Sequence, residues 1–154
     1  MGFHQFRREQ ELPLSLERAW AFLSNPVNLQ KITPGEMGFE ILTPDLPEKI
    51  YPGMIIAYRV GLLPGWRSTW VSEITQVEEG RYFVDEQRIG PYAMWHHQHL
   101  LESRERGVLM TDIVSYKPPF GPFGELARLL FIRRRLEEIF DYRERALAAE
   151  FSSS

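Results

Sequence analysis

The stretch AMWHHQHLLESRERGVLMTDIVSY, from Ala93 to Tyr116, predicts two strands joined by a tight turn. Residues 93–103 and 107–116 mix large apolar side chains with polar ones, as strands buried on one face do. The Glu105-Arg106-Gly107 segment between them is a turn signal. A connection this short favours an antiparallel hairpin. The hairpin therefore points to an antiparallel sheet.

The three histidines of this stretch divide between the two faces of the first strand. Successive side chains of a strand point to opposite faces, so His97 and His99 share a face with Trp95. His96 lies on the other face. The predicted feature is thus a pair of histidines beside a tryptophan.

The turn also predicts which residues face one another across the hairpin. A three-residue loop would shift the register by one position, but a tip at Glu105 and Arg106 is favoured. In that register the facing pairs are Trp95 with Tyr116, His97 with Val114, His99 with Asp112, and Leu101 with Met110.

The remaining chain predicts further strands and three helical segments. The strand-like runs are 3–12, 39–42, 54–62, 66–77 and 81–89, and the helical ones are 15–25, 28–33 and about 125–148. This order predicts an α+β fold with an antiparallel sheet of six to seven strands and a long C-terminal helix. One domain is expected over residues 1–148, followed by a flexible tail at 149–154. The apolar stripe of the long helix is expected to cover the sheet through Leu126, Leu129, Leu130, Leu136, Ile139, Phe140 and Leu147.

Composition narrows the function classes. The 154 residues carry a formal net charge of −3, so nucleic acid is not expected as a partner. The absence of cysteine excludes disulfides, thiol nucleophiles and cysteine-ligated metals. No signal peptide and no membrane-spanning run is recognised, so we expect a cytoplasmic protein without stable membrane insertion.

The sequence resembles the START and birch-pollen-allergen (SRPBCC) superfamily over nearly its whole length. The motifs F-x-D-x-Q-x-x-G-P-Y-x-x-W-x-H-x-H, D-x-V-x-Y and I-F-x-Y-R are similar to those of one uncharacterised bacterial branch. The resemblance implies a helix-grip fold with a cavity. Members of the branch are described as cyclase/dehydrase-like, lipid-transport-like or cell-division inhibitors, so the resemblance implies no defined reaction. The matching residues are Phe83, Asp85, Gln87, Gly90, Pro91, Tyr92, Trp95, His97, His99, Asp112, Val114, Tyr116, Ile139, Phe140, Tyr142 and Arg143.

The turn at Gly90-Pro91 leaves two registers open. A three-residue loop places Asp85 opposite His97 and Gln87 opposite Trp95, whereas a two-residue loop puts Val84 and Glu86 there. The family pattern, which contains Asp85 and Gln87, favours the first register.

Four interpretations of the histidine face compete. His97 and His99 could bind a metal with Asp112 or Asp85. His99 oriented by Asp112 could act as a general base. The face could also be solvated, beside Glu102. The favoured interpretation is a hydrogen-bonded polar patch inside a cavity, because buried polar groups need partners.

We therefore expect binding, and by extension transport, of a hydrophobic or amphipathic small molecule between the sheet and the C-terminal helix. Neither a cofactor nor a metal is expected. The alternatives are a cyclase or dehydratase using His99 and Asp112, and a regulator that binds a protein partner through an exposed apolar patch beside the helix. The expected ligand-binding residues are Trp70, Phe83, Asp85, Gln87, Trp95, His97, His99, Asp112, Val114 and Tyr116.

Three other features have two interpretations each. Arg128 and the run Arg133–Arg135 have one interpretation as a patch that binds anions or a membrane surface. The favoured interpretation is that they pair with the acidic residues that follow them on the helix. Trp66 and Trp70 line a pocket or fill the core. The segment 34–53, rich in proline and glycine, is a lid over the cavity or a plain surface loop.

Overall fold

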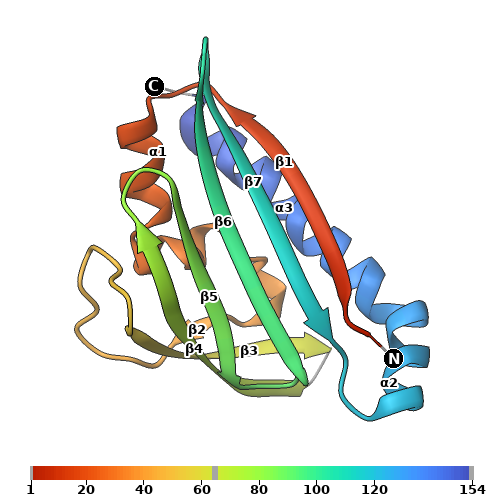
Figure 1. Ribbon diagram of the computed structural model, residues 1–154. Coiled ribbons are helices and arrows are strands. Elements are labelled where there is room, and N and C mark those ends of the chain that lie inside the picture. The colour runs from red at the N-terminus through yellow and green to blue at the C-terminus, as the bar shows by residue number, and fades with distance from the viewer. Residues whose placement is uncertain (1, 64–65, 153–154) are drawn as a thin grey trace.

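The centre of the molecule is a seven-stranded antiparallel sheet in the order β1-β7-β6-β5-β4-β3-β2 (Figure 1). This computed structural model describes residues 2–63 and 66–152. The Trp66 side chain and most of the predicted 63–65 turn fall outside that description. The strands are β1 (His4–Leu12), β2 (Glu40–Ile41), β3 (Ile55–Leu63), β4 (Trp66–Glu78), β5 (Tyr82–Ile89), β6 (Met94–Arg104) and β7 (Gly107–Lys117).

The helices lie on one side of this sheet (Figure 1). α1 (Leu16–Leu23) begins where the Ser15 hydroxyl accepts a hydrogen bond from the Arg18 amide. Two 3₁₀ helices follow, η1 (Pro26–Ile32) and η2 (Gly35–Met37). The C-terminal helix is continuous through α2 (Gly121–Ala127), the π-helical turn η3 (Arg128–Ile132) and α3 (Arg133–Phe151). The predicted helix-grip architecture is confirmed.

The predicted registers of both hairpins around β6 are confirmed. Arg104 pairs with Gly107 at the β6–β7 tip, and His99 lies opposite Asp112. Asp85 lies opposite His97, which is the register of the three-residue loop. Shifts in the β3–β4 and β4–β5 registers mark bulges, which bend strands and help the sheet curve around its core.

Gln87 closes the β5–β6 connection instead of reaching the interior. Its side-chain amide donates to the Tyr92 carbonyl at 2.7 Å and accepts from the Tyr92 amide at 3.0 Å. A Cβ on Gly90 would collide with the Gln87 side chain, so a larger residue there would displace Gln87 from these two bonds. The Q-x-x-G-P-Y part of the motif is therefore structural.

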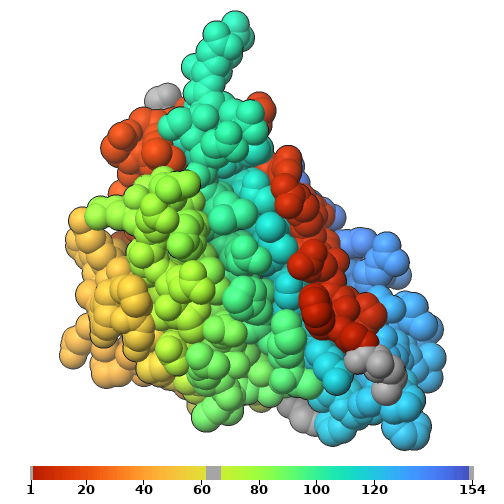
Figure 2. All heavy atoms as spheres, viewed as in Figure 1, coloured from red at the N-terminus to blue at the C-terminus, as the bar shows by residue number. Residues whose placement is uncertain are grey.

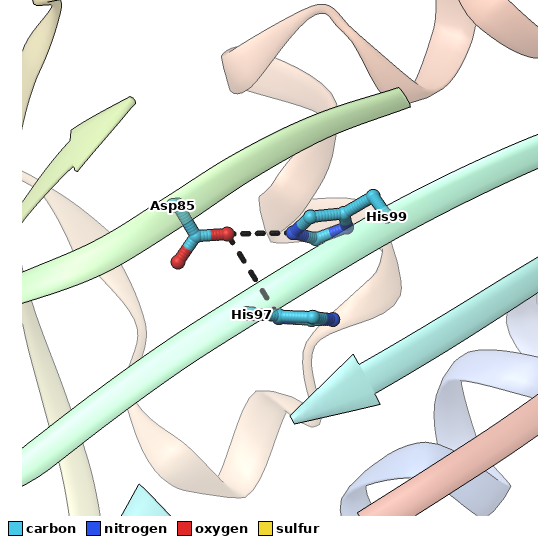
Figure 3. Close-up of side chains that lie close together, drawn as sticks. All are labelled: Asp85, His97 and His99. Carbon is cyan, nitrogen blue, oxygen red and sulfur yellow. Dashed lines mark hydrogen bonds and ion pairs between the residues drawn. The ribbon is translucent and has the colours of Figure 1, made fainter. Parts of the chain in front are cut away.

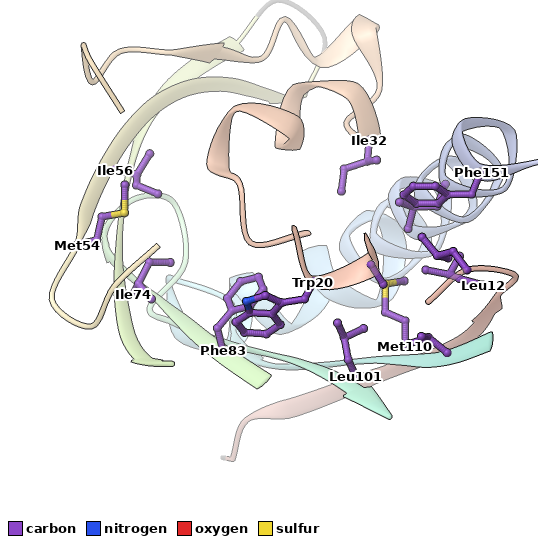
Figure 4. Packing of buried hydrophobic residues seen from close by; sticks show 14 residues of the cluster. Leu12, Trp20, Ile32, Met54, Ile56, Ile74, Phe83, Leu101, Met110 and Phe151 are labelled. Carbon is purple, nitrogen blue, oxygen red and sulfur yellow. The ribbon is translucent and has the colours of Figure 1, made fainter. Parts of the chain in front are cut away.

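The main core lies between the concave face of the sheet, α1 and α3 (Figure 4). Leu12, Val108 and Leu147 are almost completely buried within it. The Trp20 ring meets the Phe83 ring edge-on, with centroids 5.9 Å apart. Large apolar side chains from sheet and helices thus fill this end of the molecule.

Two predictions about the C-terminal helix are wrong. The helix continues to Phe151, beyond the predicted end at residue 148, because the buried Phe151 ring packs on Phe22 with centroids 5.1 Å apart. Residues 149–151 are therefore not part of a loose tail. In addition, Leu126, Leu129 and Leu130 are exposed by 55%, 66% and 58% and do not cover the sheet.

The π-helical turn accounts for the displaced stripe. Inward-facing positions run back from Leu136 through Ile132 and Arg128 to Gly124, at intervals of four. A regular helix would have alternated steps of three and four and placed Leu129 inward.

Among the helices in the described part of the chain, none is both long and apolar enough to cross a membrane.

Candidate functional site

Buried polar side chains from three adjacent strands and the C-terminal helix meet on the concave face of the sheet. Asp85 comes from β5, His97 and His99 from β6, and Asp112 from β7. Arg143 of α3 approaches from the helix side and is itself buried. We call these five residues the charged cluster. Figure 3 shows Asp85 beside the two imidazoles.

The hydrogen bonds of the charged cluster run diagonally across the strands. His97 Nε2 lies 2.8 Å from Asp112 Oδ1, and His99 Nε2 lies 2.6 Å from Asp85 Oδ2. His99 Nδ1 is 3.5 Å from Asp112 Oδ1, without a hydrogen bond. The predicted His99–Asp112 pair is thus corrected: the two face each other in register, but ring orientation joins His99 to Asp85.

Ring stacking fixes the two imidazoles. The His97 and His99 centroids are 3.7 Å apart, and Phe83 stacks on the other face of His99 at 4.0 Å. Donor atoms of Asp85, His97 and His99 lie within 4.8 Å of one another, as a metal site requires. Each ring, however, already holds a carboxylate oxygen at hydrogen-bond distance through its Nε2, at 2.8 Å for His97 and 2.6 Å for His99. The arrangement therefore suits hydrogen-bonded imidazole–carboxylate pairs better than metal chelation.

Both carboxyl groups are held in the ionised form. Burial acts to raise the pKa of Asp112, but the Arg143 charge and the His97 hydrogen bond hold that pKa well below its usual range. Burial also acts to raise the pKa of Asp85, and the hydrogen bond and charge interactions with His99 lead the effects that lower it. Two buried negative charges therefore lie on either side of the histidines.

His99 is held in the neutral form. Burial and the electrostatic effect of His97 lower the pKa of His99 to about 4, although the hydrogen bond to Asp85 opposes this shift. A neutral imidazole carries one N–H, and an ionised carboxylate can only accept. Nε2 therefore donates to Asp85, and Nδ1 is the unprotonated nitrogen.

Two atoms of the charged cluster lack hydrogen-bond partners within the described residues. They are Asp112 Oδ2 and Arg143 Nε. Arg143 Nη1 lies 3.8 Å from Asp112 Oδ1, which is a charge contact and too long for a hydrogen bond. Buried polar groups are normally satisfied, so orphaned atoms of this kind point to water or a ligand nearby.

A cavity of about 80 Å³ opens beside the charged cluster. Its polar lining comes from Asp85, His99 and Arg143, and from the Tyr58 and Ser72 hydroxyls, which lie 3.2 Å apart. The rest is mostly apolar and comes from α1, η1, residue 50 and strands β3–β5. These other lining residues are Phe22, Leu23, Asn25, Pro26, Asn28, Leu29, Ile32, Ile50, Ile56, Ile74 and Phe83.

Three of the predicted ligand-binding residues line this cavity, namely Phe83, Asp85 and His99. His97 stacks on His99, and Asp112 bonds His97 in turn. The predicted aromatic lining from Trp70 and Trp95 is packed instead, with the two rings edge-to-face at 5.1 Å. Val114 and Tyr116 pack into a cluster with Leu136 and Phe140, while Gln87 closes its turn.

Sequence reasoning missed the contribution of α1, η1, Tyr58, Ser72 and Arg143. For Arg143 a signal was present. Leu136, Phe140 and Leu147 define the buried stripe of α3, and Arg143 falls on the same stripe. An arginine at a buried helical position needs a partner, and the carboxylates predicted on the sheet were available.

No protein-family model matches the sequence, and no curated protein matches it. Solved structures match along almost its whole length. Protein TTHA0849 from Thermus thermophilus has a TM-score of 0.70 and 15% identity, over 96% of this chain and 99% of its own. Zhui aromatase/cyclase from Streptomyces sp. R1128 has a TM-score of 0.76 and 12% identity, over 97% and 94%.

A third match is Ara h 8.0201, a Bet v 1-like allergen, with a TM-score of 0.62 and 16% identity. That alignment covers 96% of this chain and 99% of the other. Identities this low establish the architecture alone. Together with the seven-stranded sheet and its long covering helix, they show that the chain has the helix-grip fold, as its SRPBCC structural neighbours do.

Proposed function

We propose that the protein binds a hydrophobic or amphipathic small molecule in the cavity between the sheet and the helices. The observation that carries the proposal is the lining, which is apolar on most sides and charged at one end. Small-molecule sites commonly combine apolar walls with a few placed polar groups. The likeness to an aromatase/cyclase and to a Bet v 1-like protein supports this function at the level of the fold.

The polar end of the cavity favours a neutral ligand with a hydroxyl or carbonyl group. Asp85 bonds His99 through Oδ2, which leaves Oδ1 to accept a bond from a ligand hydroxyl. The Arg143 guanidinium, which contributes to the cavity lining, can donate to a carbonyl. A ligand carboxylate would meet the ionised Asp85, so a permanent anion is less suitable.

The size of the cavity limits what it holds without rearrangement. Sites for drug-sized ligands measure about 300–1,000 Å³, whereas this cavity measures about 80 Å³. A larger ligand has to displace η1 or the segment around Ile50, whose amide donates to the Ser24 carbonyl at 3.2 Å. We propose that the segment 34–53 moves with η1 as the lid.

Native mass spectrometry of the protein after incubation with a hydrophobic cell extract tests the proposal. We expect the wild-type protein to retain one or a few small compounds. Leu29→Trp puts a larger side chain into the cavity from η1 and should abolish retention. Val27→Trp, on the exposed side of the same helix, should retain them.

Two outcomes would contradict the proposal. One is a wild-type protein that retains nothing from any extract. The other is equal retention by wild type and Leu29→Trp, which would place the bound compounds elsewhere. Circular dichroism of both tryptophan variants checks that each remains folded.

A second candidate function is acid–base catalysis of the cyclase or dehydratase type. The 2.6 Å His99–Asp85 pair lines the cavity and could transfer a proton. The unprotonated Nδ1 is the nitrogen that would have to accept a substrate proton, but it lies 3.5 Å from Oδ1 of Asp112, a residue that is 1% exposed and does not line the cavity. This geometry favours binding over catalysis.

A comparison of turnover and binding in His99→Gln separates the two functions. If the protein is an enzyme, the captured compound should be converted by wild type, and His99→Gln should bind it without converting it. If the protein only binds, liquid chromatography should recover the compound unchanged from both forms. Conversion that survives in His99→Gln would exclude the histidine as the catalyst.

A further inference from the structure

The first turns of the C-terminal helix carry an exposed apolar surface, which we call the helix-end patch. Its six large side chains are between 55% and 83% exposed. Figure 2 shows this segment in cyan and light blue at the lower right of the molecule, beside the start of β1. Surface apolar residues usually occur singly. The helix-end patch consists of Phe120, Phe123, Leu126, Leu129, Leu130 and Phe131.

The helix is inverted at this end, with polar groups inward and apolar groups outward. Arg128 is largely covered, and Glu125 bonds both Arg128 at 3.2 Å and His4 at 2.9 Å. Gly124 is buried so closely that a Cβ there would overlap the Pro119 carbonyl oxygen. These contacts fix the orientation of the helix, because rotating the leucines inward would break the ion pairs and the close approach at Gly124. An ordinary surface helix has the opposite arrangement.

Positive charge accompanies the helix-end patch. Residues 117–135 contain five cations and one carboxylate, whereas the whole chain has a net charge of −3. Arg133 and Arg134 are exposed at the end of the patch, with 69% and 84% of their side chains accessible. Their contacts with Glu137 and Glu138, at 3.8 and 3.4 Å, are exposed ion pairs that contribute little. Both arginines therefore remain available to an external anion.

We propose that the helix-end patch docks the protein on the surface of an anionic lipid bilayer. Phenylalanine and leucine side chains beside basic residues are the composition of helices that lie in a membrane interface. The rings and leucines would enter the boundary between headgroups and acyl chains, while Arg133 and Arg134 contact the lipid phosphates. Docking of this kind needs no membrane-spanning helix.

The charge distribution disfavours a second copy of this chain as the occupant. Glu125 is the one carboxylate in residues 117–135, and His4 and Arg128 already occupy it. Two patches facing each other would therefore bury several cations without new acidic partners. An anionic bilayer supplies both the apolar phase and the counter-charge.

Vesicle flotation tests the proposal directly on the whole protein. We expect the protein to float with vesicles of equal parts phosphatidylcholine and phosphatidylglycerol, and far less with phosphatidylcholine alone. Replacing Leu126 and Leu130 by serine should lower the partition coefficient by about tenfold or more, because two side chains lose their burial in lipid. Replacing Arg133 and Arg134 by glutamine should lower it by about fivefold for each arginine on anionic vesicles.

Matched variants distinguish binding through the helix-end patch from nonspecific adsorption to vesicles. Ile55→Ser with Ile89→Ser removes two exposed apolar residues from the strands and should leave flotation unchanged. The proposal is independent of the cavity, so Leu29→Trp should also float normally. Failure of ligand retention would therefore not affect this result.

Four results would overturn the proposal. The wild-type protein could remain unbound to anionic vesicles, or it could bind neutral vesicles equally well. It could also form a dimer in analytical ultracentrifugation that Leu126→Ser with Leu130→Ser dissociates and that vesicles do not displace. Selective capture of one acidic protein in place of lipid would contradict it as well.

Discussion

Replacing Arg143 by methionine is expected to destabilise the protein by about 3–5 kcal/mol, because it leaves a buried carboxylate without its counter-charge. Asp112 is 1% exposed, and the guanidinium of Arg143 is the main charge that lowers its pKa. Without Arg143, the pKa of Asp112 should rise. Proton uptake by Asp112 should therefore accompany part of the lost stability. Unfolding by guanidinium chloride at neutral pH measures the change in the free energy of unfolding.

The control lies on the same helix. Arg145 is exposed, and Arg145→Met should change stability by no more than about 0.5 kcal/mol. Adding Asp112→Asn to Arg143→Met should recover part of the lost stability, since the unpaired charge is removed. If Arg143→Met unfolds at the same denaturant concentration as Arg145→Met, the charged cluster does not have the role described above.

Acidification from pH 6.5 to pH 4 is expected to cost about 3 kcal/mol of folding free energy through His99. The pKa of His99 is about 4 in the folded protein and 6.5 in the unfolded chain. In this window the unfolded chain therefore binds the proton first, and the folded state loses stability. The carboxyls of Asp85 and Asp112 also have lowered pKa values, so stability continues to fall below pH 4.

Urea unfolding curves across this pH range test the assignment. The pH dependence between 6.5 and 4 should flatten in His99→Gln, which does not titrate. His96→Gln changes the neighbouring histidine on the opposite face and should keep the wild-type dependence. Equal slopes in the two variants would place the titrating group elsewhere.

The strand register could be predicted because one turn determines a whole hairpin. Once Glu105 and Arg106 form the tip, the period of two assigns every facing pair from Arg104 to Trp95. The diagonal bonds of His97 and His99 could not be predicted in this way. They depend on ring rotamers, and Phe83 and the mutual stacking of the imidazoles select those rotamers in the folded protein.

The C-terminal helix shows where periodicity fails. Leu126, Leu129 and Leu130 have the spacing of a covering stripe, but one π-helical turn moves the inward position to Arg128. The ion pairs of Glu125 then stabilise the inverted arrangement. A wider helical turn leaves no clear mark in the amino-acid pattern.

The cavity also depends on packing that the sequence does not specify. Trp70 was equally suitable as a pocket wall and as core, and the structure packs it against Trp95. The open space lies beside His99, between η1 and strands β3–β5. The volume of a cavity depends on how all the surrounding side chains pack, which is known only from the folded structure.

Methyl NMR during titration with 4-propylphenol tests the central claim most directly. The account predicts saturable shifts for Ile32, Ile56 and Ile74, which line the cavity, and none for the exposed Ile55 and Ile89. Propylbenzene, which lacks the hydroxyl, should bind more weakly because it cannot donate to Asp85. Equal shifts at all five isoleucines, or none at the three cavity positions, would contradict the claim that this cavity is the binding site.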